Sequence, residues 1–337
     1  MTGIAIIGAG MVADVHVRAL GENADLANII GVAARNREKL EAFCAPRGLT
    51  TFPDADTLLH DERVEAVIVL TPPDARAHIV ETCASLNKPL LMEKPIERTS
   101  AAAQALVERA EAADIPLGIV FQHRFRAASQ ALAARIAENA FGALTNAQII
   151  APWWRPQSYY DEPGRGTYAR DGGGVLISQA IHTLDLAQTF TGPVAEVQAL
   201  AATTRQHKME AEDFVSAGLV FANGAVGALI ATTANYPGTA ESIVLDFEHA
   251  AIRLQSGVLD IFWHDGRTEQ VGEPATTGGG ADPMAFPHDW HAALQRDFLL
   301  AIREGRAPRV TARDALQTHR LIDAIMQSSR EGKKITV

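Results

Sequence analysis

Short apolar runs alternate with longer amphipathic segments through residues 1–122 of the chain. This alternation is typical of parallel βαβ units, in which a helix returns the chain to the same edge of the sheet after each strand. The pattern therefore predicts a doubly wound parallel sheet of the Rossmann type. The expected strands are residues 4–7, 29–34, 64–70, 90–93 and 117–121, and the expected helices are residues 12–20, 37–47, 75–86 and 101–113.

The pattern changes after residue 122. A predicted helix at residues 127–139 is followed by longer strand-like runs, with Asn223-Gly224 as a hairpin turn. We predict a division into a dinucleotide-binding domain, residues 1–122, and a substrate-binding and oligomerisation domain, residues 123–337. The second domain is expected to be α+β with a large, mostly antiparallel open sheet. Its strands are expected at residues 144–151, 194–204, 214–221, 225–233, 242–247 and 258–263, and its last two helices at residues 289–304 and 312–330.

Several of these strands are apolar or small at both alternating positions, residues 225–233 most clearly. Such a strand is expected to have both sheet faces covered. Helices of the same chain can cover one face, and a second subunit is a natural cover for the other. We therefore expect a homodimer or homotetramer that assembles through the second sheet.

Composition excludes several classes of partner. The formal net charge of −10 gives the chain no general attraction to nucleic acid or to an anionic membrane. No apolar run approaches the roughly 20 residues that span a bilayer, and no export signal is recognised. The two cysteines, Cys44 and Cys83, have no metal-type spacing, so a reducing, cytoplasmic setting is expected, with no metal site. The spacing of His288, Asp289 and His291 is better explained by a helix start than by a metal.

The stretch "AIIGAGMVADVH" places two glycines between the first strand and the first helix. Gly8 would make the tight turn, Gly10 would let the backbone approach a pyrophosphate, and Ala13 would permit close helix packing. The helix N-terminus attracts an anion. We therefore expect a bound dinucleotide here, although a glycine turn without a ligand is the simpler alternative. The expected contacts come from Gly8, Ala9, Gly10, Met11 and Val12.

Arg35 follows the second strand, where a protein that prefers NAD usually presents an acid to the ribose hydroxyls. A guanidinium suits a 2′-phosphate through its charge and its bidentate geometry. We therefore predict NADP as the cofactor, with NAD as the second choice. If Arg35 is instead solvated or stacks on the adenine, either cofactor would bind.

Further motifs resemble the Gfo/Idh/MocA family of oxidoreductases. They are Thr71-Pro72-Pro73, His78, Glu93-Lys94-Pro95, the stretch from Gln122 to Phe125 and the C-terminal "RLIDAIMQSSREGKKITV". The resemblance covers essentially the whole chain. It implies a Rossmann domain plus an open-sheet domain, NAD or NADP, and oxidation or reduction at a carbinol carbon of a sugar, an inositol or a derivative. It also implies that Thr71, Pro72, His78, Glu93, Lys94 and Gln122 lie beside the cofactor.

By this resemblance Lys94 is the active-site lysine and Lys94-Pro95 a cis peptide. Lys94 falls beyond a strand's carboxyl end, where such sheets bind ligands, and proline makes a cis bond accessible. The lysine could hydrogen-bond the reacting hydroxyl and the nicotinamide ribose, whereas Glu93 is expected to orient the loop. The resemblance also places Arg124 beside cofactor and substrate.

The stretch "GGGVLISQAIHTLD", from Gly172 to Asp185, places polar residues on one predicted helix. If residues 175–189 are helical, Ser178, His182 and Asp185 share a face. His182 is the candidate acid/base, because histidine titrates nearest neutral pH, and Asp185 could orient its imidazole or bind a substrate hydroxyl. The alternative is a helix-packing histidine beside an aspartate. The three glycines favour the catalytic interpretation, because they let the backbone approach a ligand.

In the family an acid or amide usually stands where this chain has Ser178. A serine cannot act as a carboxylate base at neutral pH, so more of the proton chemistry would rest on His182 and Lys94. The chain could alternatively have weakened catalysis. Two other functions therefore compete with a dehydrogenase: a dinucleotide-binding sensor, and a lyase or hydrolase that uses a bound dinucleotide without net redox change.

Aromatic residues and arginines are concentrated between Trp153 and Arg170. Aromatic faces stack on sugar rings, and arginines bind carboxylates or phosphates. Two substrate classes stay open, a sugar or uronic-acid-like ligand and a carboxylated cyclic or aromatic-derived alcohol or aldehyde. Stabilisation of the loop by its own side chains is the alternative for each residue. The expected substrate contacts are Lys94, Arg124, Trp154, Arg155, Tyr160, Ser178 and His182.

Overall fold

The predicted doubly wound parallel sheet is confirmed. A computed structural model describes residues 1–337 and contains a five-stranded sheet in the order β2-β1-β3-β4-β5, with every neighbouring pair parallel. The strand order reverses between β1 and β3, which is where sheets of this kind bind ligands beyond the carboxyl ends of their strands. The strands are β1 (Thr2–Ile7), β2 (Ala27–Ala33), β3 (Ala66–Val69), β4 (Leu90–Met92) and β5 (Leu117–Ile119).

The helices of this part mostly match the predicted ones. Thr99 is the N-cap of α5, because its side chain accepts a hydrogen bond from the Ala102 backbone. The five-residue helix α3 was not predicted, since it is too short to show a periodic pattern and begins at a side-chain cap from Asp54. The elements are α1 (Ala13–Glu22), α2 (Arg37–Cys44), η1 (Ala45–Arg47), α3 (Ala55–Leu59), η2 (Pro73–Ala75), α4 (Ala77–Ser85) and α5 (Ser100–Ala112).

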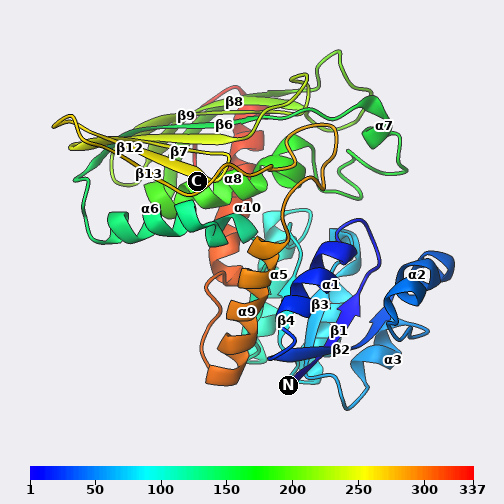
Figure 1. Ribbon diagram of the computed structural model, residues 1–337. Helices are drawn as coiled ribbons and strands as arrows, with labels where there is room; N and C mark the ends of the chain where they lie inside the picture. Colours follow the sequence, from blue (N-terminus) through cyan, green and yellow to red (C-terminus); the bar gives the residue numbers. More distant parts are fainter. The chain divides into compact units, whose positions relative to one another are not determined.

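The chain forms two compact units, and their composition differs from the predicted division in one segment. The first unit holds Met1–Phe121 together with His288–Leu316, and the second holds Gln122–Pro287 and Gln317–Val337. Helix α9 (Asp289–Glu304), orange in Figure 1, packs beside α1 in the first unit. A sequence pattern identifies this helix but not the surface on which it packs, so residues 288–316 could not be assigned to a unit from the pattern alone.

The second unit is built on a nine-stranded sheet in the order β13-β12-β11-β10-β6-β9-β8-β7-β14. Its neighbouring strands are antiparallel except for β6 and β9, which confirms the mostly antiparallel prediction. Strands β11, β13 and β14 were not predicted. The strands are β6 (Leu144–Pro152), β7 (Val194–Ala202), β8 (Phe214–Phe221), β9 (Val226–Thr232), β10 (Ser242–Phe247), β11 (Ala250–Gln255), β12 (Val258–Trp263), β13 (Thr268–Val271) and β14 (Ile335–Thr336).

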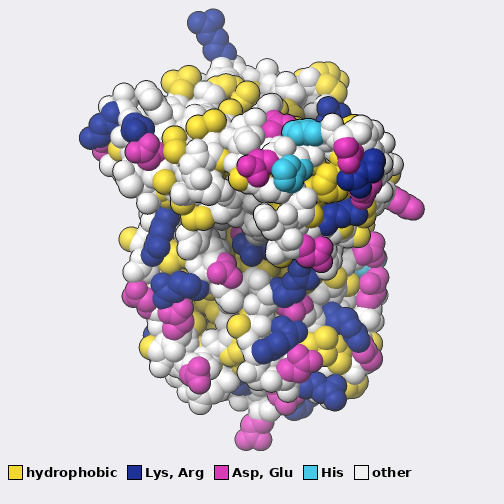
Figure 2. Space-filling model, turned by 90° about the vertical axis from the view of Figure 1, so that its left-hand side faces the viewer, with side chains coloured by type: hydrophobic (Ala, Val, Ile, Leu, Met, Phe, Trp, Pro, Cys, Tyr) yellow, Lys and Arg dark blue, Asp and Glu magenta, His cyan; other side chains and the backbone are white.

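Helices lie on one face of this sheet only (Figure 1). They include α6 (Ala127–Ala137), α8 (Ile181–Thr191) and α10 (Ala312–Glu331), and the shorter elements are η3 (Gln122–Phe125), α7 (Gln157–Tyr160) and the π-helix η4 (Leu176–Ala180). The other face exposes large apolar side chains, among them Leu200, Val226, Ile230 and Phe262. Figure 2 shows apolar side chains, in yellow, on the surface among charged and polar ones. Within one chain, therefore, only one face of the sheet is covered by helices.

None of the helices combines the length and the apolar character needed to span a bilayer.

Candidate active site

The glycine loop of the first unit has the backbone that a dinucleotide needs. Gly8 has φ of +117°, and a Cβ there would lie 3.0 Å from the Leu70 carbonyl carbon, so a side chain would be strained. A Cβ at Gly10 would meet no atom within 4 Å, which leaves open space beside the loop. Helix α1 begins with no side-chain hydrogen bond at its N-cap, Val12. Its N-terminal N–H groups can therefore donate hydrogen bonds to an anion, and the residues present fit a pyrophosphate.

Arg35 lies at the same edge of the sheet as this loop. It is exposed and follows Ala33, the last residue of β2, whose carbonyl accepts a hydrogen bond from the Gly8 backbone at 2.8 Å. The neighbouring Asn36 side chain caps α2. A flexible, exposed guanidinium at this edge can reach a phosphate on the ribose of a bound dinucleotide.

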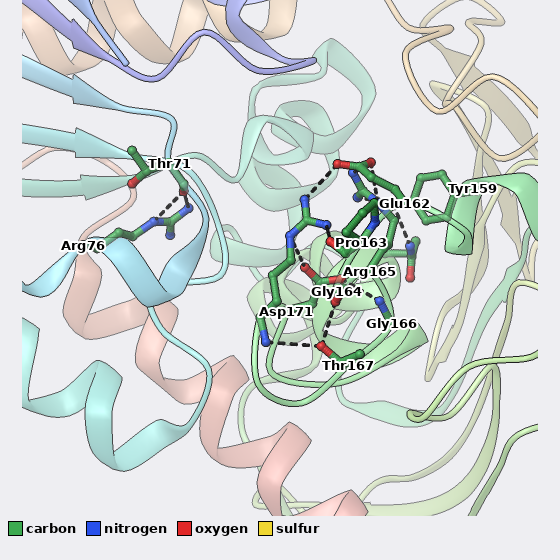
Figure 3. Close-up of polar contacts among 12 residues, drawn as sticks. Thr71, Arg76, Tyr159, Glu162, Pro163, Gly164, Arg165, Gly166, Thr167 and Asp171 are labelled. Atoms are coloured by element: carbon green, nitrogen blue, oxygen red, sulfur yellow. Dashed lines mark hydrogen bonds and ion pairs between the residues drawn. The ribbon is translucent and has the colours of Figure 1, made fainter. Parts of the chain in front are cut away.

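The loop after β4 carries Lys94, and the predicted cis peptide between Lys94 and Pro95 is confirmed. A residue that sequence reasoning missed holds this loop. Arg76, buried at 2% exposure, donates to the backbone carbonyls of Glu93 and Pro95, and to that of Thr71 at 2.7 and 3.0 Å (Figure 3). Burial lowers the pKa of Arg76 to about 10, so the guanidinium stays charged at neutral pH. One cation thus joins the loops that follow β3 and β4.

His78, predicted to bind the cofactor, has a different environment. Its side chain is 70% exposed, and its Nε2 lies 2.8 Å from Asp56 Oδ1 of α3. The residues on either side of Lys94, Glu93 and Pro95, accept hydrogen bonds from Arg76, which lies two residues before His78. The family resemblance pointed to this helix start but did not identify which of its polar side chains turns inward.

Glu93 is buried and ionised. Burial would raise the pKa of this carboxyl, but the hydrogen bond from His16 and nearby positive charge, including that of Lys94, lower it to about 2. Glu93 Oε1 lies 2.9 Å from His16 Nε2, and Glu93 Oε2 accepts from the Lys94 backbone N–H at 3.2 Å. The prediction that Glu93 orients the loop agrees with these contacts.

In the second unit, the glycine cluster begins the segment that carries His182. Glu212 accepts backbone hydrogen bonds from Gly174 and Leu176, each at 3.1 Å, and its carbonyl accepts from Val175. A Cβ at Gly174 would lie 1.7 Å from the Glu212 carbonyl oxygen. We expected the glycines to let a ligand approach. At Gly174, the missing side chain makes room for the backbone of Glu212.

The predicted continuous helix at residues 175–189 is interrupted, because a π-helical turn, η4, precedes α8. Ser178 lies in this turn and is half-buried. Asp185, fully buried, forms a two-point ion pair with Arg124 of η3, at 2.7 Å from Nε and 2.5 Å from Nη2. We predicted that Asp185 would orient the imidazole of His182 or bind a substrate hydroxyl. Both of its oxygens accept from Arg124, and these two roles stay predictions.

The imidazole of His182 stacks on that of His123, with ring centroids 4.9 Å apart and planes inclined by 30°. His123 Nδ1 lies 3.8 Å from Glu241 Oε1, which is also 2.7 Å from Arg126 Nη1. His123, Arg126 and Glu241 are all buried. Sequence reasoning missed this arrangement because Glu241 lies 115 positions from Arg126. Gln122, predicted to bind the cofactor, is buried at the start of η3, and its Oε1 has no partner.

Two predicted substrate contacts have structural roles. Arg155 is buried, and its guanidinium donates to the carbonyls of Trp154, Gly278 and Gly280 at 2.5–2.8 Å. The hydroxyl of Tyr160 lies 2.7 Å from Thr233 Oγ1. These contacts agree with loop packing, which was the alternative considered for each, and substrate contact by either residue stays a prediction. Trp154, the third predicted contact of this loop, is half-buried, so part of its ring is accessible to a ligand.

Beyond Tyr160, the loop is held by its own ion pairs. Glu162 accepts from both Arg165 and Arg170, at 2.5 and 3.0 Å, and Arg165 also donates to the Tyr159 hydroxyl at 3.0 Å (Figure 3). Asp171 accepts from the Gly166 backbone at 2.8 Å. These contacts give the polar residues of this loop a structural explanation.

Comparison with known proteins identifies the family. The model described as "Oxidoreductase family, NAD-binding Rossmann fold" matches residues 2–121, and the GFO/IDH/MocA C-terminal domain model matches residues 129–253. D-apiose dehydrogenase of Paraburkholderia graminis is 26% identical, with 98% of this chain and 88% of that protein covered. The scyllo-inositol 2-dehydrogenase (NADP(+)) IolW of Bacillus subtilis is 23% identical, with 84% of each covered.

Solved structures share the fold over almost the full length. The WlbA dehydrogenase of Bordetella pertussis, in complex with NADH and UDP-GlcNAcA, superposes with a TM-score of 0.85 at 26% identity. The match covers 99% of this chain and 98% of the WlbA chain. The chain therefore belongs to the Gfo/Idh/MocA family of oxidoreductases, with its NAD-binding Rossmann fold in residues 2–121.

Proposed function

We propose that this oxidoreductase transfers hydride between a nicotinamide cofactor and the hydroxyl-bearing carbon of a sugar, polyol or sugar acid. One observation in the first unit carries the proposal. The uncapped N-terminus of α1 follows β1, and the Arg76-held loop with Lys94 follows β4, so both lie beyond the carboxyl ends of strands in one parallel sheet. An anion site and a fixed lysine at one sheet edge suit a dinucleotide and the substrate it oxidises.

The residues of the chain would supply binding and proton chemistry, while the bound nicotinamide would accept or donate the hydride. The ammonium of Lys94 would hydrogen-bond the reacting oxygen. His182 would remove the hydroxyl proton during oxidation and return it during reduction. Ser178, with no charge to offer, would bind substrate and take no part in proton transfer. Arg124 pairs with Asp185 of the His182 helix and is a candidate substrate contact, since 18% of its side chain is exposed.

For the cofactor, we propose NADP ahead of NAD. The exposed guanidinium of Arg35 beside the Gly8 loop supports this choice. The names of relatives point in both directions, because IolW is named for NADP(+) whereas the Bordetella pertussis structure holds NADH.

The substrate class rests on the names of the relatives. They act on or bind a branched sugar, a cyclitol and a nucleotide-linked sugar acid. Trp154 offers this chain an aromatic face for a sugar ring, whereas the Arg155 guanidinium and the Tyr160 hydroxyl form hydrogen bonds within the protein. We therefore place a sugar-like substrate ahead of a carboxylated aromatic one.

A panel of sugars, polyols, sugar acids and hydroxy acids, each supplied with NADP⁺ or NAD⁺, tests the function through the absorbance of the reduced nicotinamide. Turnover of a sugar-like member is expected. NADPH binding without turnover of any member would favour the sensor alternative. A product formed with no net change in nicotinamide would favour a lyase or hydrolase.

We also propose that a second copy of the chain covers the open face of the nine-stranded sheet, giving a homodimer or a homotetramer. The apolar side chains of Leu200, Ile230 and Phe262 on that face support the assembly. Light scattering should show that Ile230→Lys lowers the assembly state, while Lys39→Asp on the exposed surface of α2 leaves it unchanged. We propose the cytoplasm as its location, which suits two buried free thiols, Cys44 and Cys83.

A further inference from the structure

His16 lies on the dinucleotide helix itself, one turn from its start. It is completely buried on the inner face of α1, between the glycine loop and the end of β4. Its Nε2 is 2.9 Å from Glu93 Oε1, on the loop that carries Lys94. One hydrogen bond therefore connects the helix expected to receive the cofactor's pyrophosphate with the loop expected to serve the substrate.

The tautomer of His16 follows from its neighbour on α9. The side-chain nitrogen of Gln295 lies 3.3 Å from the His16 carbonyl and 3.0 Å from His16 Nδ1. A carbonyl only accepts, so the atom facing it is the amide N–H₂ donor. The same amide then donates to Nδ1, which must be unprotonated. The ring proton consequently lies on Nε2 and is donated to Glu93.

The same hydrogen-bond network reaches the backbone N–H of Lys94 through Glu93. Glu93 uses Oε1 for His16 and Oε2 for the Lys94 N–H, so its carboxylate is held at both oxygens. Arg76 holds the carbonyl side of the same loop. The backbone of Lys94 is therefore held by His16 of α1, through Glu93, and by Arg76 at the start of α4, through the neighbouring carbonyls.

A metal ion is the main alternative for this cluster. Donor atoms of His16, Glu93 and His291 all lie within 4.8 Å of one another. A metal would need the Nε2 lone pair of His16, but that nitrogen carries the proton donated to Glu93. The Glu93 carboxylate also already faces the charges of Lys94 and Arg76, so a divalent cation would add a third positive group. The hydrogen-bonded chain accounts for the cluster better.

We propose that His16 is a positioning residue for Lys94, coupling the location of the dinucleotide helix to the backbone of the lysine. The inference deepens the proposed function and rests on it for the role of Lys94. Loss of the His16 donor would release one oxygen of Glu93 and loosen the Lys94 backbone, while the glycine loop and the helix N-terminus would stay as they are. Misplacement of a catalytic group by about 1 Å costs on the order of 100-fold in rate.

The test compares His16→Met, which removes the donor, with His16→Gln, whose amide can still donate to Glu93. Gln295→Leu serves as a second variant, because it removes the amide that orients His16 without touching the glycine loop. Asn23→Ala is the matched control, since Asn23 joins α1 to the Ala292 carbonyl of α9 at 2.9 Å and does not contact Glu93. Hydrogen exchange of the Lys94 amide measures the positioning directly, and it needs no turnover.

We expect His16→Met to speed exchange at the Lys94 amide by about tenfold or more, and Gln295→Leu to act in the same direction. In steady-state assays His16→Met should lower kcat by about 10- to 100-fold with NADPH affinity nearly unchanged, and His16→Gln should recover most of it. Unchanged Lys94 exchange in His16→Met, or an equal increase in Asn23→Ala, would overturn the proposal. If the wild-type protein turns over no substrate, the function fails, whereas amide exchange still decides the role of His16.

Discussion

The carboxylate of Asp185 is held at both oxygens by the guanidinium of Arg124, with donor–acceptor distances of 2.7 and 2.5 Å. Asp185 belongs to α8, the helix of His182, and Arg124 belongs to η3, the turn of His123. The two imidazoles that stack on each other are therefore carried by two elements joined through one buried ion pair.

Loss of this pair should be costly. Asp185→Asn would remove the buried carboxylate charge that accepts from Arg124 at two points, and breaking a buried pair from one side costs about 3 kcal/mol or more. Urea unfolding measures the change in the free energy of unfolding. Glu41→Gln is the matched control, because it breaks the exposed Arg37–Glu41 pair and should cost no more than about 0.5 kcal/mol. Equal losses in the two variants would contradict the structural role of the buried pair.

Gly174 should tolerate no side chain. Gly174→Ala would place a Cβ 1.7 Å from the Glu212 carbonyl oxygen, which is backbone and has little room to move. We expect a loss of several kcal/mol, on the order of severe overpacking. Gly21→Ala, on an exposed position of α1 with nothing within 4 Å of the added Cβ, should instead gain up to about 1 kcal/mol. Thermal unfolding of the two variants side by side separates these outcomes, and a neutral Gly174→Ala would refute the packing.

His291 should make the protein sensitive to moderate acid. Burial lowers the pKa of its imidazole from 6.5 to about 3. The unfolded chain therefore takes up a proton at this residue before the folded chain does, and stability present above pH 6.5 is lost as the pH falls toward 3. The maximal slope for one proton is about 1.4 kcal/mol per pH unit.

Urea titrations between pH 7 and pH 4 check this expectation. His291→Phe should flatten the dependence in that range, whereas His60→Phe, at an exposed position, should leave it as in the wild type. Glu93, with its pKa lowered to about 2, acts in the same direction but only below its ordinary value of 4.5. A wild-type stability that does not fall between pH 6.5 and 4.5 would contradict the buried, neutral state of His291.

Arg35 should decide the preference between the two cofactors. Arg35→Asp replaces a phosphate-binding cation with an acid that suits free ribose hydroxyls, so the ratio of NADPH to NADH affinity should fall by about tenfold or more. Fluorescence titration of both reduced cofactors measures the ratio. Arg37→Asp makes the same charge change in α2 at a side chain paired with Glu41, and it should alter the ratio little. An unchanged ratio in Arg35→Asp would remove Arg35 as the phosphate-binding residue.

Residues close together in sequence were the predictable part of this protein. Short apolar runs predicted the strands of the first sheet, amphipathic segments predicted its long helices, and the glycine spacing predicted the loop before α1. The cis peptide at Lys94 came from the family resemblance. Partners distant in sequence were not predictable in this way: His16 and Glu93 are 77 positions apart, and Arg126 and Glu241 are 115 apart.

The use of a polar side chain was also difficult to predict from the sequence. Arg155 has the chemistry of a substrate contact, but its guanidinium is consumed by loop carbonyls that a sequence pattern does not reveal. His78 and Arg76 lie two positions apart on the same short stretch, and only the packed structure distinguishes the exposed side chain from the buried one.

Paired assays of the wild type, Lys94→Ala and His182→Ala test whether this protein oxidises or reduces a sugar-like substrate with Lys94 in contact with the reacting oxygen. Each is titrated with NADPH and then assayed with the best member of the sugar and polyol panel. We predict turnover by the wild type, a loss of about 100-fold or more in both variants, and dinucleotide affinity that stays close to the wild-type value. Unchanged turnover in the variants would contradict the roles of Lys94 and His182. A wild type that binds NADPH and turns over no panel member would contradict the proposed oxidoreductase function.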